Sequence, residues 1–395
     1  TFMLVIGYTN LYSQTIHTFG DSTMSNYDTS TTEQRGWGMY FGEFLKGNFI
    51  CSNHGAAGTD SRYCYQYAMP RFKNKILPGD YVIIQYAHND MKHNGIDYDE
   101  LYSFYIGQGM EEEAKSLKKF GTNPSTTYKS WLTKIIESCR ELNANPIFVS
   151  SVCRANFSSD KITRKAKHDI GDSYSILTSE GIVSNQKISE DDHTMDYAYQ
   201  LKSLAKELNV PFIDLTSASA ELFEQYGSFK THKYLNMPSD YTHFRQDGAY
   251  TIARLVARLM IEQGILENNL FVDSNIVDAV EACTLIDLAE EIVDKDFDIE
   301  IKTRLEDALE TLKNQSPTYS NDSYQELKVQ LELANKSIEE HNGNSDAIEL
   351  IGCNDVFSVG IYTVNGSFIG NNIDYHSLPK GIYIVNGKLI MNKYH

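Results

Sequence analysis

Ser22 lies in the segment FGDSTM, directly after an apolar run, and its hydroxyl is a candidate nucleophile. A serine hydroxyl is a poor nucleophile unless a neighbouring base takes its proton. His243, in the segment DYTHF, is a candidate for that base, because imidazole takes up and releases protons near neutral pH. Asp240, three residues earlier, can bond the other ring nitrogen and fix the tautomer. These three catalytic candidates predict acyl transfer through a serine.

Acyl transfer also needs hydrogen-bond donors for the oxyanion that forms in the transition state. The segment NHGAAG (53–58) contains glycines, which let backbone N–H groups approach a substrate oxygen closely. The segment HND (88–90) offers the side-chain amide of Asn89. We expect the oxyanion hole to consist of the backbone N–H groups of Ser22 and Gly58 and the side chain of Asn89.

The elements that must position these residues follow from an alternation of apolar runs and helical patterns between residues 15 and 268. We expect strands at 16–20, 49–53, 81–86, 146–151 and 210–214, and helices at 36–46, 61–75, 127–143, 196–208 and 247–264. This alternation predicts an α/β fold with a parallel sheet covered by helices on both faces. Ligands of such sheets bind at the carboxyl ends of the strands. The candidate residues follow strands there and are predicted to meet at one edge.

Each of these blocks has a structural interpretation when it is taken alone. A serine after a strand is often a helix N-cap, for example. Four such blocks in this order, most of them at a strand end, favour catalysis over four unrelated structural roles.

The blocks GDS, N…G, HND and DxxH resemble those of the SGNH (GDSL-type) hydrolases. Over about residues 15–265 the sequence resembles the rhamnogalacturonan acetylesterase-like carbohydrate esterases of the family 12 type. The segments that carry this resemblance are GDSTM (20–24), RGWG (35–38), NHGAAGTDSR (53–62), GDYVIIQYAHND (79–90), SSVCRANF (150–157), LAKELNVPFIDLT (204–216) and DYTHFRQDGA (240–249).

The resemblance implies a three-layer α/β/α, flavodoxin-like sheet that needs no metal or organic cofactor. It also implies that acetyl groups are removed from an acetylated polysaccharide or oligosaccharide through an acyl-serine intermediate, with pectic rhamnogalacturonan expected first and xylan second. Two positions depart from the family pattern. Ala87 replaces a usual glycine, and Asp60 replaces a small residue and is expected to add negative charge near the pocket. The aromatic-rich segment 91–126 is either a substrate-shaping loop or a surface insertion.

Several further residues are candidates for substrate contacts. Trp37 could stack on a sugar, although a tryptophan between two glycines is also typical of core packing. Arg62 and Arg154 could hold a uronic carboxylate in bidentate fashion, or form structural salt bridges. His88, beside Asn89, is a third candidate.

Asp191 and Asp192 next to His193 raise the question of a metal site. The sequence places no third ligand at a suitable spacing, so we expect a loop there and no metal. The six cysteines lack metal-ligand spacing as well. In an exported protein Cys51 could pair with Cys64 and Cys139 with Cys153, or all could be buried free thiols.

Charge and the two ends of the chain bear on partners and location. The net charge of −18 argues against nucleic acid and anionic membrane surfaces as partners. Residues 1–14 contain an apolar run too short to span a bilayer, which predicts either a truncated signal peptide or a first strand. On the signal-peptide interpretation the protein is exported without membrane insertion, to the periplasm, the cell surface or the medium.

Composition changes after residue 268. Residues 273–342 show helical periodicity and predict a small helical module. Residues 346–395 contain two similar segments, GIYTVNGSFI and GIYIVNGKLI, whose Asn-Gly pairs predict two β-hairpins. This region resembles tail domains of exported Bacteroidetes proteins, which implies contact with export machinery and a Gram-negative source. A simple folding cap is the alternative.

Two other functions compete with polysaccharide deacetylation. A short-chain lipid or general esterase would use the same serine on longer acyl chains. A non-catalytic glycan-binding surface protein would keep the fold without ester turnover.

Overall fold

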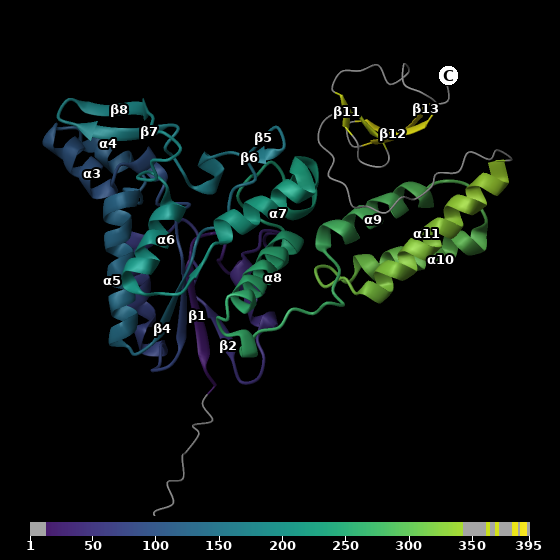
Figure 1. Ribbon diagram of the computed structural model, residues 1–395, viewed down its shortest axis with the longest axis horizontal. Coiled ribbons are helices and arrows are strands. Elements are labelled where there is room, and N and C mark those ends of the chain that lie inside the picture. The colour runs from purple at the N-terminus through teal and green to yellow at the C-terminus, as the bar shows by residue number, and fades with distance from the viewer. Residues whose placement is uncertain (1–12, 343–360, 364–367, 371–380, 386–387, 393–395) are drawn as a thin grey trace, which may run out of the picture.

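A computed structural model describes residues 13–342 and four strands within 361–392 (Figure 1). Residues 1–12, which hold nearly all of the predicted signal peptide, lie outside the described residues. Within the described part of the chain, no helix has the length and apolar character needed to cross a membrane.

A five-stranded parallel sheet forms the centre of the molecule, in the order β2-β1-β3-β4-β9. The strands are β1 (Thr15–Gly20), β2 (Ile50–Asn53), β3 (Tyr81–Gln85), β4 (Asn145–Val149) and β9 (Phe212–Ile213). The predicted α/β fold and its five parallel strands are therefore confirmed, with bounds shifted by one or two residues. Strand order reverses between β1 and β3, and a crevice at such a switch point is where ligands bind in open α/β sheets.

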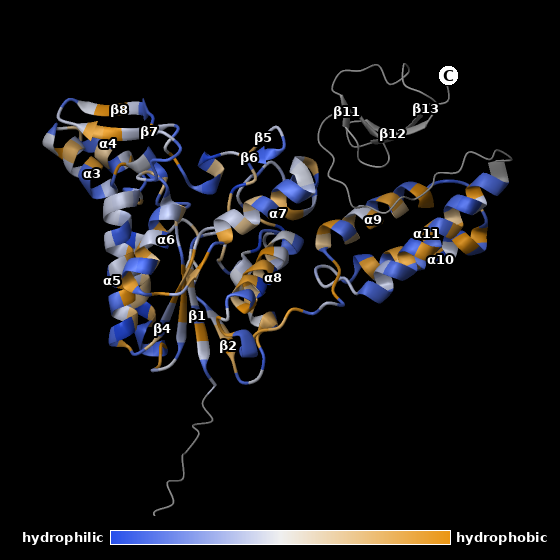
Figure 2. Ribbon diagram, in the orientation of Figure 1, coloured by the Kyte–Doolittle hydropathy of each residue, from blue (hydrophilic) through white to orange (hydrophobic). Residues whose placement is uncertain are grey.

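Helices cover both faces of this sheet (Figure 1). One face carries α5 (Lys129–Glu141) and α6 (Tyr197–Leu208), and the other carries α7 (Leu215–Lys230) and α8 (Gln246–Glu262). Successive residues of a strand point to opposite faces. Ile83 accordingly packs with α7 and α8, whereas Val82 and Ile84 pack with α5 and α6. In Figure 2 the strands carry apolar residues among polar ones, as along β1.

One predicted helix is wrong in type. Residues 36–46 form the 3-10 turns η1 (Trp37–Met39) and η2 (Phe41–Phe44) instead of an α-helix. The physical reason is close packing at glycines: a Cβ on Gly36 would lie 2.3 Å from the Ser25 carbonyl oxygen. Residues 61–75 are helical throughout, as predicted, in four consecutive segments: α1 (Ser61–Tyr63), the π-helical η3 (Cys64–Ala68), α2 (Met69–Phe72) and the 3-10 turn η4 (Lys73–Lys75).

Other elements were not predicted. Helix α7 is one, and the segment 91–126 contains α3 (Tyr98–Gly107) and α4 (Glu111–Ser116). Two small antiparallel hairpins follow β4, formed by β5 (Phe157–Ser158) with β6 (Lys161–Ile162) and by β7 (Tyr174–Thr178) with β8 (Gly181–Gln186). The five described cysteines, Cys51, Cys64, Cys139, Cys153 and Cys283, are free thiols, so neither disulfide considered from the sequence is formed.

Beyond residue 268 three helices pack around their own apolar core: α9 (Ala279–Val293), α10 (Ile299–Lys313) and α11 (Asn321–Asn342). They also contact the sheet domain. Val280 of α9 belongs to the core cluster beneath α8, and Asp287 of α9 accepts hydrogen bonds from the side chains of Lys233 and Tyr234.

The last strands, β10 (Ile361–Thr363), β11 (Phe368–Gly370), β12 (Gly381–Val385) and β13 (Lys388–Asn392), form one antiparallel sheet. Strands β10 and β11 pair with each other, as do β12 and β13, as expected for the two predicted hairpins. The role of this sheet in export stays a prediction.

Two histidines and an aspartate form a buried chain beneath the sheet. His17 Nε2 lies 3.2 Å from Asp80 Oδ2, and His17 Nδ1 lies 2.9 Å from His54 Nε2. The His54 ring also stacks on Phe72. If His17 donates to Asp80, its Nδ1 can only accept, and His54 must donate to it. The contact between the two rings therefore excludes a state in which both rings are protonated.

The unfolding free energy should fall as pH decreases from 7 to 5, because burial lowers the pKa of His54 to about 4 and also lowers that of His17. The folded His54 ring stays neutral where the unfolded chain binds a proton, so this residue costs about 1.4 kcal/mol per pH unit below about pH 6.5, and His17 acts in the same direction. In urea unfolding at several pH values, the free energy of unfolding should depend on pH less steeply in His54→Gln than in the wild type, by about one proton. The free energies of unfolding are first compared at pH 8, where the His54 imidazole is neutral. If that free energy then depends on pH as steeply in His54→Gln as in the wild type, the expectation is contradicted.

Candidate active site

Ser22 lies in the tight turn that follows β1, at the carboxyl end of the sheet and beside the β1/β3 switch point. Asp21 Oδ1 accepts hydrogen bonds from the N–H and the hydroxyl of Thr23, which closes the turn. Gly20 is required before it, since a Cβ there would lie 2.7 Å from the Met24 sulfur. The turn leaves Ser22 only 8% exposed, with its Oγ directed to a histidine.

That histidine is His243, whose Nε2 lies 2.9 Å from Ser22 Oγ. Its other nitrogen, Nδ1, lies 2.7 Å from Asp240 Oδ2. The second oxygen of Asp240 accepts the backbone N–H groups of Thr242 and His243, at 2.7 and 3.0 Å. One carboxylate therefore shapes the loop with one oxygen and orients the ring with the other. The structure thus brings together the three catalytic candidates of the sequence.

Electrostatics favours the protonation states that catalysis requires, an ionised Asp240 and a neutral His243 that carries its proton on Nδ1. Burial tends to raise the pKa of Asp240, but the hydrogen bonds from the His243 ring and the two backbone N–H groups outweigh it, and the pKa is lowered. An ionised Asp240 can only accept, so Nδ1 carries the ring proton. Nε2 is then free to accept the proton of Ser22. The chemistry that this arrangement can perform is proton removal from the serine during attack on an ester.

The predicted oxyanion donors lie around the same serine. The N–H of Ser22 and the N–H of Gly58 donate to no residue in the described part of the chain. Gly58 has φ of +70°, a conformation that favours glycine. Asn89 follows β3, and its Nδ2 donates one hydrogen to the Thr59 carbonyl at 2.9 Å. That bond fixes the amide and leaves its second hydrogen available for a substrate oxygen.

Replacing Asn89 with alanine should lower kcat about 10²–10³-fold, with a smaller change in KM, because an oxyanion donor acts mainly in the transition state. Initial rates of aryl acetate hydrolysis would measure both constants. The matched control is Asn26→Ala, an amide on the neighbouring loop that bonds only the Asn53 backbone and side chain. Equal kcat values for Asn89→Ala and the control would exclude Asn89 as an oxyanion donor.

One predicted substrate contact, Trp37, is wrong because of its burial, and another, Arg62, forms the structural salt bridge that was its alternative. Trp37 is 0% exposed, and its Nε1 donates to Gln85 Oε1 at 2.8 Å, so it packs the core and cannot stack on a sugar. Arg62 pairs with Asp99 at 3.0 Å and donates to the Lys119 carbonyl. Asp60, which was expected to add negative charge near the pocket, is 0% exposed, and its carboxyl oxygens accept the N–H groups of Tyr63 and Gly121, so it faces the protein interior.

Two residues near the site were missed or undervalued. Tyr241, between Asp240 and His243, is 50% exposed and packs edge-on against His232, so it offers an aromatic surface beside the catalytic pair. Its position inside DYTH was the only available signal. Asp21 is buried, which raises its pKa to about 6, and its Oδ2 has no partner in the described residues.

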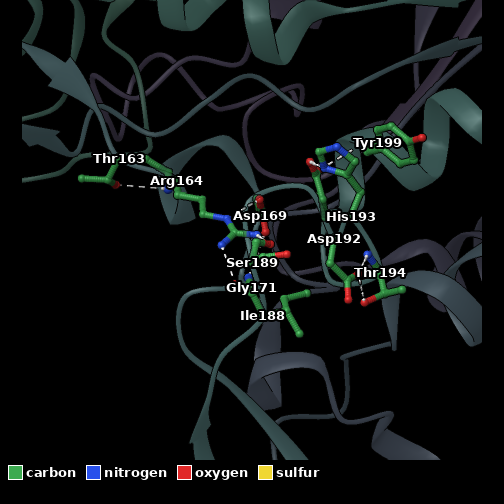
Figure 3. A network of polar contacts seen from close by, with 12 residues as sticks. Thr163, Arg164, Asp169, Gly171, Ile188, Ser189, Asp192, His193, Thr194 and Tyr199 are labelled. Atoms are coloured by element: carbon green, nitrogen blue, oxygen red, sulfur yellow. Dashed lines mark hydrogen bonds and ion pairs between the residues drawn. The ribbon is translucent and has the colours of Figure 1, made fainter.

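The sequence raised a metal site at Asp191 and Asp192, but the structure places other residues around His193. Within the described residues, ligand atoms of Asp169, His193 and Asp196 lie within 4.8 Å of one another. Figure 3 shows, however, that Arg164 reaches Asp169 from the side. Its guanidinium also donates to the carbonyls of two residues, Ile188 and Ser189. A cation would meet this positive charge, so the geometry favours an ion-pair network.

No protein-family model matches the chain. It is similar to rhamnogalacturonan acetylesterase RhgT of Bacillus subtilis, with 29% identity over 260 residues, which is 62% of this chain and 89% of that protein. It is also similar to "Probable rhamnogalacturonan acetylesterase YesY" of the same organism, with 28% identity over 254 residues, 63% of this chain and 94% of that protein.

Among solved structures, the acetylxylan esterase Axe2 of Geobacillus stearothermophilus aligns with a TM-score of 0.37 and 13% identity, over 64% of this chain and 94% of that one. Joined to the contact geometry at Ser22, the similarity to the two Bacillus proteins indicates that the chain is a carboxylic ester hydrolase.

Proposed function

We propose that the chain is an exported serine acetylesterase that removes O-acetyl groups from plant cell-wall polysaccharide, with pectic rhamnogalacturonan as the preferred substrate and xylan as the second. The observation that carries the proposal is the Ser22–His243–Asp240 relay, with contacts of 2.9 and 2.7 Å. The names of the two Bacillus relatives support the choice of substrate. The half-exposed Tyr241 beside the relay suits a sugar ring.

The reaction would proceed in two halves. Ser22 Oγ attacks the acetyl carbonyl carbon while His243 Nε2 takes the hydroxyl proton, and the negative oxygen is stabilised by the N–H groups of Ser22 and Gly58 and by Asn89. The C–O bond to the sugar breaks, and the sugar oxygen takes the proton from His243. Water, deprotonated by His243, then attacks the acetyl-serine, and acetate leaves as Ser22 recovers its proton.

The test is acetate release from acetylated rhamnogalacturonan, acetylated xylan and an aryl acetate, with Ser22→Ala as the blank. Release from the polysaccharides by the wild type alone, greatest from rhamnogalacturonan, would support the proposal. No release from any polysaccharide by folded protein would overturn it.

A series of aryl esters with acyl chains of two to eight carbons separates the main alternative. Activity that falls sharply beyond acetyl supports an acetylesterase. Activity that persists or rises with chain length would instead indicate a lipid or general esterase.

A further inference from the structure

Four tyrosines form an exposed aromatic surface beside the segments of the oxyanion hole, and this surface is called the tyrosine platform below. Two of them lie four residues apart in α1 and η3, with ring centroids 5.0 Å apart, and two lie four residues apart in α3, with ring centroids 5.8 Å apart. Three of the residues are 38–59% exposed, and the fourth is half-buried. Apolar groups that gather on an exposed surface indicate a binding site, whereas single ones do not. The four residues are Tyr63, Tyr67, Tyr98 and Tyr102.

Arg62 joins the two halves of the platform. It precedes Tyr63 in α1, and its guanidinium lies over the Tyr98 ring, 4.6 Å from the ring centroid. The same guanidinium donates to Asp99 Oδ1 at 3.0 Å and to the Lys119 carbonyl at 2.6 Å. These contacts fix α1 against α3 and hold one face of Tyr98 in place. A ligand therefore meets a surface whose backbone is already fixed, which lowers the entropic cost of binding.

The platform begins close to the oxyanion hole. Asp60, two residues after Gly58, caps α1 by accepting the Tyr63 N–H at 2.8 Å. Because Tyr63 follows Gly58 by five residues, their Cα atoms lie at most about 18 Å apart. Figure 1 places α3 at the same end of the sheet, beyond the carboxyl ends of its strands. A sugar chain whose acetyl group lies at Ser22 is therefore long enough to reach the platform within a few residues.

The chemistry of the platform suits a carbohydrate. Each tyrosine offers a flat apolar face with a hydroxyl at its edge, and a pyranose ring offers a face of C–H groups with hydroxyls at its edge. Within the described residues, none of the four tyrosine hydroxyls has a hydrogen-bond partner, so all four are available to a sugar.

Another ring considered from the sequence lies too deep for stacking. His88 is 3% exposed, and its carbonyl accepts Arg154 Nη2 at 3.1 Å. Trp37 is fully buried. Contacts by stacking with a polysaccharide therefore need exposed rings such as those of the platform.

We propose that the tyrosine platform binds sugar rings of the polysaccharide beyond the acetylated residue, and so favours long substrates over short ones. The inference rests on the proposed acetylesterase function. It assigns the aromatic segment 91–126, through α3, to substrate binding. Since the platform touches neither the acetyl group nor Ser22, it lowers KM for a polymer and leaves the chemical step unchanged.

The test compares acetylated rhamnogalacturonan with a short acetylated fragment of the same polymer and with an aryl acetate. For the wild type we expect kcat/KM per acetyl group to be about 10–100-fold higher on the polymer than on the fragment, as for several stacked rings. In Tyr67→Ala/Tyr102→Ala, which removes one ring from each half of the platform, this ratio should fall at least about fivefold through a rise in KM. The rate on aryl acetate should not change.

Two further variants serve as controls. Tyr67→Trp keeps an aromatic face at this position and should keep the ratio. Tyr199→Ala is the matched control and should also keep it, because Tyr199 is 47% exposed and its ring stacks on His193, outside the platform. If the double variant does not fold, Tyr67→Ala and Tyr102→Ala are measured singly, and each should lower the ratio about 2–10-fold.

The outcomes separate this inference from the function on which it rests. Equal wild-type kcat/KM on polymer and fragment, or a wild-type ratio in the folded double variant, would overturn the platform and leave the acetylesterase intact. If neither polymer nor fragment releases acetate while aryl acetate is hydrolysed, the proposed function fails, and migration in a native gel containing deacetylated rhamnogalacturonan decides the platform. Retardation that the double variant loses would support it, and retardation that is absent or kept would overturn it.

Light scattering covers the remaining occupant of such a surface, a second copy of this chain. A wild-type dimer that becomes a monomer in Tyr67→Ala/Tyr102→Ala, with the polymer-to-fragment ratio unchanged, would show a subunit interface and overturn the proposal. We expect the same molecular mass for both proteins.

Discussion

Ser22→Ala is expected to lower kcat by about 10⁴–10⁶-fold, because it removes the hydroxyl that is bonded to His243 Nε2. The loss of one hydrogen bond should change stability by only about 1 kcal/mol. Hydrolysis of an aryl acetate, together with thermal unfolding of both proteins, would measure the two effects separately.

Two variants sharpen this result. Ser30→Ala removes a hydroxyl of the same region that bonds only Asp28, and it should retain wild-type kcat. The double variant Ser22→Ala/His243→Ala should be about as slow as Ser22→Ala alone, because the two residues act as a unit. A tenfold or smaller effect of Ser22→Ala would show that the nucleophile lies elsewhere.

Asp240→Asn is expected to lower kcat by about 10³–10⁴-fold, close to the loss known for such triads in serine proteases. The amide oxygen of asparagine can still accept the N–H groups of Thr242 and His243, so the loop should keep its shape. Its NH₂ group, however, would donate to Nδ1 of His243 and leave the ring proton on Nε2. That tautomer cannot accept the proton of Ser22.

The rate at which a fluorophosphonate labels Ser22 would report this change directly, and it should fall together with kcat. Asp28→Asn is the control, since Asp28 closes a similar turn through Ser30 and touches no histidine. Labelling of Asp240→Asn at the wild-type rate would contradict a role for Asp240 in setting the tautomer.

The sheet could be predicted because short segments with apolar residues, clearest in the YVIIQ of β3, alternate with helical patterns. Because parallel strands end at the same edge of a sheet, Ser22 and Asn89 could be placed together there without any knowledge of side-chain contacts. The helix α7 was not predicted, since its sequence is rich in serine and interrupted by Gly227, which takes a non-helical φ of 75°. Its stability comes from packing of residues such as Phe223 against the sheet, which a local pattern does not record.

The substrate contacts illustrate a different limit. The sequence offered Arg62 and Arg154 as equivalent candidates, and only the fold decides which one is paired. Asp99, which holds Arg62, lies 37 residues away in a helix that the sequence analysis did not predict. Trp37 was likewise ambiguous, because its partner Gln85 comes from another strand. Pairing between distant segments is thus the information that local patterns lack.

The helices beyond residue 268 are bound to the element that follows the catalytic histidine. Asp247, near the start of α8, accepts the Ser316 hydroxyl at 2.9 Å, and Gln246 donates to the Ser316 carbonyl at 2.7 Å. With Asp287 on Lys233 and Tyr234, these bonds clamp the chain on both sides of the 236–245 loop. Heat should therefore melt the sheet domain and α9–α11 in one cooperative transition, and a protein shortened after residue 268 should melt earlier and lose activity before it loses its sheet.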